Sequence, residues 1–363
     1  MKPEAPQDLY IVSSSPHAHC GESVQRVMLD VVIALLPALA ASIWFFRWDA
    51  LRLNAVCVGT CLLAEWLCRK AMNRANTLTD FSAVITGLLL AFNLPPSLPT
   101  WMAVTGSLFA IIIAKQVFGG LGYNPFNPAL AGRAFMLISF TGEMTTWSRS
   151  PWIQKVTFAA TDAATAATVE AANSAEAVVD AMTGATPLGL AKDALKAGQP
   201  LPLFDASLLQ DFLLGNVNGC IGETSALALL IGAVYLLCRK VITWHIPVAY
   251  LLSVFVYAGI LHWVAPESSI PPHFHLLTGG LILGAFFMAT DMVTTPLTKR
   301  GMIVFGLGCG LLTMLIRTVT SGSYPEGVSF AILIMNAFTP LINRATRARI
   351  FGTQNKKPRP TAS

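Results

Sequence analysis

Long apolar segments recur along almost the whole chain, and they limit what it can fold into. Of its 363 residues, 54% are hydrophobic and 12% are charged, whereas an ordinary soluble domain carries roughly 25% charged residues. A helix that crosses the hydrocarbon core of a bilayer needs about 20 mostly apolar residues. The sequence therefore predicts an all-α integral membrane protein, and it excludes an ordinary cytosolic enzyme or a nucleic-acid-binding protein. Ten segments fit this pattern: 27–46, 51–68, 79–95, 99–117, 124–140, 222–238, 242–264, 274–291, 301–319 and 326–342.

Lysine and arginine residues between these segments predict how the chain is oriented. Cytoplasmic loops of membrane proteins are enriched in both residues, and here they gather after the second, sixth and eighth segments and in the C-terminal tail. The opposite loops, at 93–99 and 265–272, contain neither. Arg47 and Arg52 in the short first loop run against the rule. The pattern as a whole predicts that both termini are cytoplasmic.

The predicted helices divide into two groups of five around one long polar segment. Residues 141–218 carry eight acidic and four basic side chains and are rich in Ala, Thr and Asp. A segment of this length can form a small lobe outside the membrane. We therefore expect five regions: a cytoplasmic segment at 1–26, a five-helix half at 27–140, an external lobe at 141–219, a second five-helix half at 220–342 and a basic tail at 343–363.

One short motif in the polar segment is the best candidate for chemistry. Glycine and alanine at 184 and 185 leave the backbone open to a bulky group. Pro187 biases Thr186 toward an extended conformation that presents the hydroxyl group. From the residues alone, an ordinary loop of small residues explains the segment as well. The motif consists of Asp180, Thr183, Gly184, Ala185 and Thr186.

Two interruptions near the ends of predicted helices suggest a second site. The segment 124–128 contains two prolines, which remove backbone donors, and Thr294-Thr295-Pro296 occupies the matching place after the eighth span. Paired interruptions in two halves are typical of inverted repeats that enclose a binding cavity, although a plain turn between helices is the alternative. The residues that we expect in such a pocket are Asn124, Asn127, Thr290 and Asp291.

Several ionisable residues fall within or at the edges of the predicted spans. Charge inside hydrocarbon is costly and marks either function or a buried pair, and long side chains near a helix end reach the interface. We expect most of these residues to pair or to reach the interface, and we assign no ion pathway and no metal site. The residues are Asp30, Glu65, Asp80, Lys115, Arg133, Glu223, Asp291 and Arg317.

The motif around Thr186 resembles the flavinylation site of two bacterial redox complexes, Rnf and the sodium-pumping NADH:quinone reductase. Both follow the pattern Asp-x-x-(Ser/Thr)-Gly-Ala-Thr, and Thr183 stands here where serine is common. The segments 119–129 (GGLGYNPFNPA) and 289–296 (ATDMVTTP) are similar to signatures in the two membrane halves. The chain is identified over essentially its full length as a member of the NqrB/RnfD family of membrane subunits, and it resembles the Rnf branch of that family most closely.

This resemblance implies a function that the residues alone do not establish. An exported flavin transferase, using FAD and magnesium, would join FMN through a phosphoester to Thr186, with the other motif residues as its recognition context. The chain would carry electrons within a ferredoxin:NAD oxidoreductase (Rnf) complex that moves protons or sodium ions across the bacterial inner membrane. The flavin would face the periplasm, and the second pocket would hold riboflavin or another non-covalent flavin.

The resemblance also implies partners. These would be a second flavinylated subunit, membrane subunits with an iron–sulfur cluster, and cytoplasmic subunits that handle NADH and ferredoxin. The chain has no nicotinamide-binding fingerprint, so it holds no complete active site. Two alternatives stay open at this point: the NqrB subunit of a sodium-pumping quinone reductase, with a quinone acceptor, and, in a different class, a solute channel or transporter without a redox role.

Overall fold

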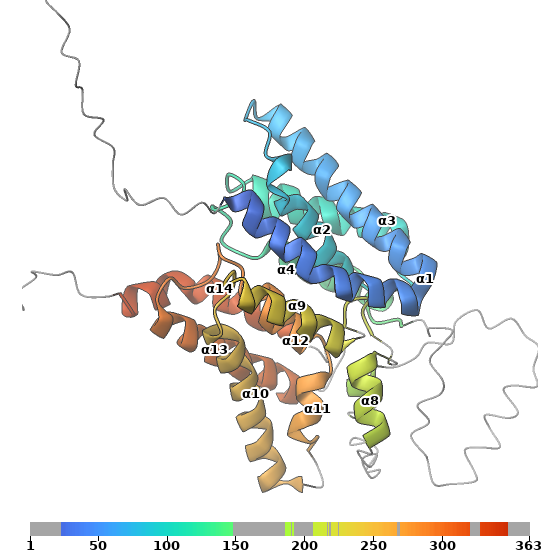
Figure 1. The fold of residues 1–363 in the computed structure, drawn as a ribbon, viewed down its shortest axis with the longest axis vertical. Helices are drawn as coiled ribbons and strands as arrows, with labels where there is room; N and C mark the ends of the chain where they lie inside the picture. Colours follow the sequence, from blue (N-terminus) through green and yellow to red (C-terminus); the bar gives the residue numbers. More distant parts are fainter. Residues whose placement is uncertain are drawn as a thin grey trace, which may run out of the picture.

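Helices account for all the regular secondary structure in the part of the chain that is described. A computed structural model describes residues 23–147, 186–189, 191, 206–215, 217, 219–223, 225–266, 269–319 and 327–347. Figure 1 shows two groups of helices: the N-terminal group (blue to green) packs against the C-terminal group (yellow to red). The expected all-α architecture is confirmed for these residues.

The first half begins with one long bent helix, where two separate spans were expected. This helix, α1, bends at Arg47, whose φ of 47° and ψ of −117° are not helical. The third and fourth spans are likewise irregular, because the third begins as a short 3₁₀ turn and the fourth ends as a π-helix. The elements are α1 (Val24–Ala71), η1 (Leu78–Asp80), α2 (Ser82–Phe92), α3 (Thr100–Leu108), η2 (Phe109–Gln116), α4 (Pro128–Ser139) and α5 (Thr141–Met144).

The described part of the second half contains three long helices and one broken one. The broken helix corresponds to the predicted span 274–291 and is interrupted at Gly279 and Gly280, which both have positive φ angles. Residues with a side chain rarely adopt such angles. The elements are α8 (Ala206–Leu214), α9 (Ala226–Cys238), α10 (His245–Val264), α11 (Pro272–Leu277), α12 (Leu281–Leu283), η4 (Gly284–Met288), α13 (Lys299–Val319) and α14 (Val328–Ala345).

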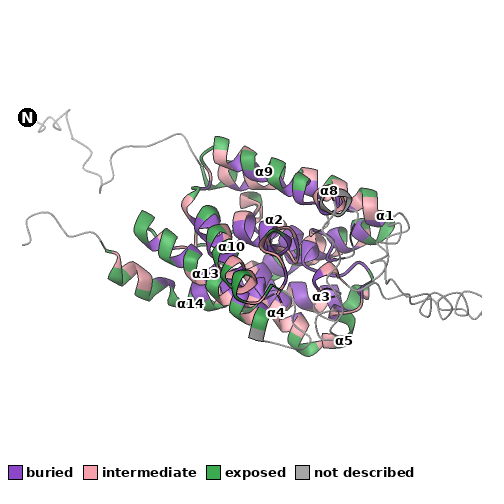
Figure 2. Ribbon diagram, turned by 90° about the horizontal axis from the view of Figure 1, so that it is seen from below, coloured by how far each residue is buried: buried purple, intermediate pink, exposed green. Residues whose placement is uncertain are grey.

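The described helices have the lengths and surfaces of a membrane protein. Four are long and apolar enough to cross a bilayer, namely α1, α10, α13 and α14, and shorter apolar helices lie at 82–92, 100–116, 128–139 and 226–238. Large apolar side chains such as Leu63, Phe255 and Leu311 are exposed on the outside. Figure 2 shows buried residues on the inner faces of the helices and exposed ones on the outer faces. A continuous apolar exterior of this kind fits contact with lipid.

Backbone contacts join the two halves closely. Ile221 and Gly222, just before α9, donate amide hydrogen bonds of 3.1 and 2.9 Å to the carbonyls of Leu94 and Phe92 at the end of α2. Helix α9 packs along α1, and α14 packs against α4. A Cβ atom at Gly232 of α9 would overlap the carbonyl oxygen of Ala34 in α1. Glycine therefore allows α9 and α1 to approach one another at backbone distance.

This close approach makes Gly232→Ala a sharp test of the packing. Alanine normally stabilises an exposed helix interior relative to glycine by about 1 kcal/mol, but overlap with the Ala34 carbonyl should destabilise the protein by about 1–3 kcal/mol. The matched control is Gly59→Ala in α1, because a Cβ there meets no atom within 4 Å. Thermal unfolding of the detergent-purified variants should show a lower midpoint for Gly232→Ala only. Equal midpoints would contradict the α1–α9 contact.

Candidate functional site

Thr186 lies just before a single helical turn formed by residues 187–189. The amide of Gly189 donates a hydrogen bond of 3.2 Å to Thr186 Oγ1, as at a helix N-cap. This bond uses one of the two lone pairs of the hydroxyl, and the side chain is half-buried. Thr186 is therefore presented beside the turn and is not built into a helix. The rest of the predicted motif lies outside the described residues: Asp180, Thr183, Gly184 and Ala185.

A small apolar core holds the Thr186 turn in place. Leu188 and Ala191 are buried together with Phe212 of α8 and Phe274 of α11. The two phenylalanine rings meet edge to face, with centroids 5.4 Å apart, which is a favoured aromatic geometry. The turn is thus fixed against the broken helix of the second half.

A small pocket opens beside Thr186. Its polar side chains include Glu223 and Thr278, and Gly279 forms part of the wall. Gly279 has a φ of 70°, and a Cβ there would lie 2.8 Å from Arg317 Nη2. Glycine therefore allows both the break in the helix and the close approach of the arginine.

Arg317 of α13 stabilises the break behind this pocket. It is 2% exposed, and its guanidinium donates hydrogen bonds to the carbonyls of His275 (2.9 Å), Thr278 (3.0 Å) and Gly279 (3.2 Å). The last carbonyls of a helix have no partner within that helix. Arg317 supplies partners to those at the end of α11, so the chain can break at a buried position.

A second buried arginine lies on the other side of Glu223. Arg133 Nη1 in α4 lies 3.6 Å from Glu223 Oε1, with both side chains 5% exposed, and the same guanidinium donates to Asn93 Oδ1. Arg133 thereby links the first half to the segment before α9. Arg133 and Arg317 are thus both buried in the region behind the Thr186 pocket.

A second and larger cavity lies between the two halves. All four residues that the sequence predicted for a second pocket line it: Asn124, Asn127, Thr290 and Asp291. Lys115 and Ser82, which the sequence did not assign to a pocket, line it as well. Apolar side chains from α1, α2, α9 and η4 complete the walls. A mostly apolar cavity with a few polar groups is typical of a site for a cofactor or other small molecule.

Hydrogen bonds fix the polar side chains of this cavity. Asn127 caps α4, because its Oδ1 accepts from the amides of Ala129 (3.0 Å) and Leu130 (3.4 Å), and its Nδ2 donates to the carbonyl of Met288 (3.3 Å). Asn124 Nδ2 donates to the carbonyl of Phe126 at 3.0 Å. Asn124 Oδ1 is buried and accepts no hydrogen bond from any of the described residues. An unsatisfied buried acceptor at a cavity wall is suited to a ligand donor.

The turn after η4 orients the other two predicted residues. Thr290 Oγ1 donates to the carbonyl of Phe286 at 2.6 Å. The carboxylate of Asp291 accepts from the amide of Val293 (3.4 Å) and from the hydroxyl of Thr294 (3.3 Å). Local hydrogen bonds within the turn therefore fix the carboxylate of Asp291 at the cavity wall.

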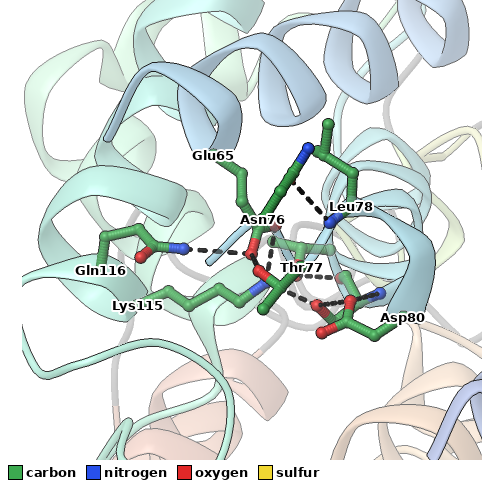
Figure 3. A network of polar contacts seen from close by, with 9 residues as sticks. Glu65, Asn76, Thr77, Leu78, Asp80, Lys115 and Gln116 are labelled. Carbon is green, nitrogen blue, oxygen red and sulfur yellow. Dashed lines mark hydrogen bonds and ion pairs between the residues drawn. The ribbon is translucent and has the colours of Figure 1, made fainter. Parts of the chain in front are cut away.

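The expectation that charges within the spans would pair is confirmed for three pairs. Lys115 meets Glu65 at 2.9 Å, Arg133 meets Glu223 at 3.6 Å, and Arg239 meets Asp30 at 3.1 Å. Figure 3 shows Lys115 and Gln116 approaching Glu65, with Thr77 also within reach. The first of these pairs is almost fully buried, with side chains 2% and 0% exposed.

A sequence model described as the NQR2, RnfD, RnfE family matches residues 11–352. The chain belongs to this family. The match includes Thr186 and every residue named above as lining the two cavities. The resemblance inferred from the motifs is thereby confirmed.

Curated relatives match over nearly the full length of both chains. The D subunit of the Na(+)-translocating ferredoxin:NAD(+) oxidoreductase complex of Acetobacterium woodii is 44% identical, covering 95% of this chain and 96% of the relative. The D subunit of the proton-translocating ferredoxin:NAD(+) oxidoreductase complex of Clostridium ljungdahlii is 42% identical, covering 96% and 98%. The D subunit of the ion-translocating oxidoreductase complex of Escherichia fergusonii is 40% identical, covering 95% and 99%. These relatives are subunits of redox enzyme complexes.

Because Arg317 Nη2 lies so close to Gly279, we expect this position to tolerate no side chain. Gly279→Ala should destabilise the protein by about 1–3 kcal/mol, since it places a Cβ at a positive φ and against Arg317 Nη2. Gly259→Ala in α10 is the control, because the nearest atom to a Cβ there is Pro272 Cγ at 3.9 Å. Thermal unfolding in detergent should separate the two variants. An unchanged midpoint for Gly279→Ala would show that the arginine does not hold this break.

Proposed function

We propose that the chain is a membrane subunit that carries FMN on Thr186 and passes electrons within an ion-translocating ferredoxin:NAD oxidoreductase complex. The observation that carries this proposal is the placement of Thr186. Its hydroxyl lies beside a pocket and next to a turn that an apolar core holds in place. Membership of the family and the names of the relatives support the assignment to such a complex.

The residues around Thr186 fit a phosphoester-linked flavin. The Thr186 hydroxyl faces the pocket, and Gly279 leaves one part of the pocket wall without a side chain. Arg317 lies directly behind that wall, next to Gly279, and its positive charge would favour a phosphate group in the pocket. Thr186 would anchor the cofactor, so that it could not diffuse away. A flavin accepts one or two electrons, which allows it to link one-electron and two-electron carriers.

The larger cavity fits a second, non-covalent flavin such as riboflavin. Asn124 Oδ1 lacks a donor among the described residues, and the imide N–H of a flavin ring would supply one. Asn127, Thr290 and Asp291 would surround the polar edge of the ring, and the apolar side chains of α2 and η4 would pack on its faces.

We further propose ten membrane spans in two inverted halves, with both termini in the cytoplasm and the Thr186 lobe in the periplasm of a bacterial inner-membrane protein. Basic residues support this orientation, because Arg69 and Lys70 lie at the end of α1, Lys299 at the start of α13 and Arg344 near the end of α14. Figure 1 places the start of α1 and the end of α14 on the left and α8 on the right. The two cavities would then lie toward opposite faces of the membrane.

Electron transfer between two such faces would account for ion coupling. Moving one charge across the membrane potential involves about 2.3 kcal/mol per 100 mV, so electron flow and cation flow can be linked through that potential. The proposed partners are a second flavinylated subunit, iron–sulfur membrane subunits, cytoplasmic NADH- and ferredoxin-handling subunits, and a flavin transferase that modifies Thr186. The recognition context of that transferase would be Asp180, Thr183, Gly184 and Ala185.

Covalent attachment gives a direct test at Thr186. The wild-type chain, produced with its flavin transferase and denatured on a gel, should retain flavin fluorescence in its band. Thr186→Val should abolish this fluorescence completely because it removes the acceptor oxygen, whereas Thr186→Ser should retain part of it because the hydroxyl is kept. Thr278→Val is the matched control, since Thr278 lines the same pocket but would carry no flavin. A fluorescent Thr186→Val band, or a dark wild-type band, would contradict the proposal.

The second flavin can be tested at Asn124. Asn124→Ala should lower the amount of acid-extractable riboflavin that copurifies with the chain by about tenfold, because it removes a hydrogen bond worth roughly 1–2 kcal/mol. Asn54→Ala is the control. Asn54 is also buried, donates to a backbone carbonyl and has an Oδ1 without a partner among the described residues, but it does not line the cavity. Equal riboflavin content in both variants would contradict the assignment.

A further inference from the structure

Lys115 is a buried cation that lines the larger cavity. It lies near the end of η2 and is 1% exposed. An ammonium group has three N–H donors, and three acceptor atoms lie within reach: Glu65 Oε1 (3.0 Å), Glu65 Oε2 (2.9 Å) and Ser82 Oγ (2.7 Å). The ammonium therefore occupies one position and has no donor left for a proton-transfer role.

Glu65 is held as firmly as Lys115. Besides the ammonium, its Oε1 accepts hydrogen bonds from Thr77 Oγ1 (3.0 Å) and Gln116 Nε2 (3.1 Å). Ser82 is also fixed, because its hydroxyl and amide donate to Asp80 Oδ1 at 2.7 and 3.0 Å. Figure 3 shows Glu65 near the centre of these contacts, with Lys115 and Gln116 reaching it from η2. Such a network holds a charge in place without rearrangement when a ligand changes its own charge.

Of this ion pair, only the cation reaches the cavity wall. Lys115 and Ser82 line the cavity, whereas Glu65 is not among its lining residues. The positive member of the pair is thus nearer to a ligand than the negative member. The other charged side chain in the wall is Asp291, whose carboxylate already accepts from Thr294 and from the Val293 amide. At reduced dielectric the nearer charge dominates, because Coulomb energy falls with distance.

We propose that Lys115 is a positioning cation that raises the reduction potential of the electron-accepting ring bound in this cavity, and that Glu65 and Ser82 hold it there. This proposal rests on the proposed second flavin. A ring that accepted one electron from an iron–sulfur donor, oxidised in the same step, would gain one unit of negative charge. Lys115 would stabilise this negative charge by Coulomb attraction, and its ammonium group would keep its proton. The reduced ring is thereby bound more tightly than the oxidised ring.

Four variants of the full chain test the proposal through the midpoint potential of the bound riboflavin, without an activity assay. Each also carries Thr186→Val, so that riboflavin added to the purified protein is the only flavin signal. The predicted order of midpoint potentials, from highest to lowest, is Glu65→Gln, the parent, the double variant Lys115→Met with Glu65→Gln, and Lys115→Met. Lys115→Met should also weaken binding of reduced riboflavin about tenfold more than binding of oxidised riboflavin. Spectroelectrochemical titration and equilibrium dialysis measure the two effects.

The controls separate folding from electrostatics. Lys115→Met leaves a buried carboxylate without its partner, so it can fail to fold, but the double variant removes both charges and buried pairs of this kind are often replaceable by neutral residues. The matched control removes an ion pair that lines neither cavity, Arg239→Met with Asp30→Asn, and should leave the potential unchanged.

The outcomes are distinct. The order given above supports the proposal, and so does a lowered potential in the double variant alone when Lys115→Met does not fold. Potentials equal to that of the parent in the double variant and in Glu65→Gln would overturn it, because Lys115 would then be purely structural. If the parent binds no riboflavin while Asn124 and its neighbours are intact, the second flavin site itself is wrong, and the role of Lys115 is wrong with it.

Discussion

A buried arginine satisfies the backbone at the break beside the Thr186 pocket, and a buried lysine bonds the first side chain of the helix beside the larger cavity. In hydrocarbon, a backbone group without a partner costs several kcal/mol, so a broken helix survives only if other groups satisfy it. Arg317 does so for the carbonyls of His275, Thr278 and Gly279 at the end of α11. Lys115 bonds to Ser82, where α2 begins just after Phe81 with its φ of 59°.

The two cations occupy corresponding places in the two halves. Each lies near the C-terminal end of the helical segment that follows the broken one: Lys115 near the end of η2 and Arg317 near the end of α13. Each contacts the start or the interruption of the broken helix; Lys115 lines the larger cavity, and Arg317 lies behind the wall of the Thr186 pocket. An inverted repeat would place these equivalent positions toward opposite faces of the membrane. A buried cation that contacts a broken helix, present in both halves, would thus create two sites for electron carriers, one toward each face of the membrane.

Much of the fold could be predicted from the sequence because a helix that crosses a bilayer needs a long apolar segment. Each predicted span has a helical counterpart within a few residues, and Asn124, Asn127, Thr290 and Asp291 do gather around one cavity. The continuity of α1 through Arg47 was not predicted, since two nearby arginines look like a loop. The breaks at Phe81 and Gly279 were missed because no proline marks them. Lys115 was recognised as a charge within a span, but its place at the cavity depends on packing between α2, η2 and η4, which one sequence does not reveal.

We propose that one chain carries two flavins, one through a phosphoester at Thr186 and one bound non-covalently in the larger cavity. Mass spectrometry of the intact purified chain tests this most directly, first under native conditions and then after denaturation. The account predicts one FMN phosphoryl group that stays on the peptide containing Thr186 and one riboflavin that leaves on denaturation. A chain that carries neither flavin, when produced in cells with an active flavin transferase, would contradict it.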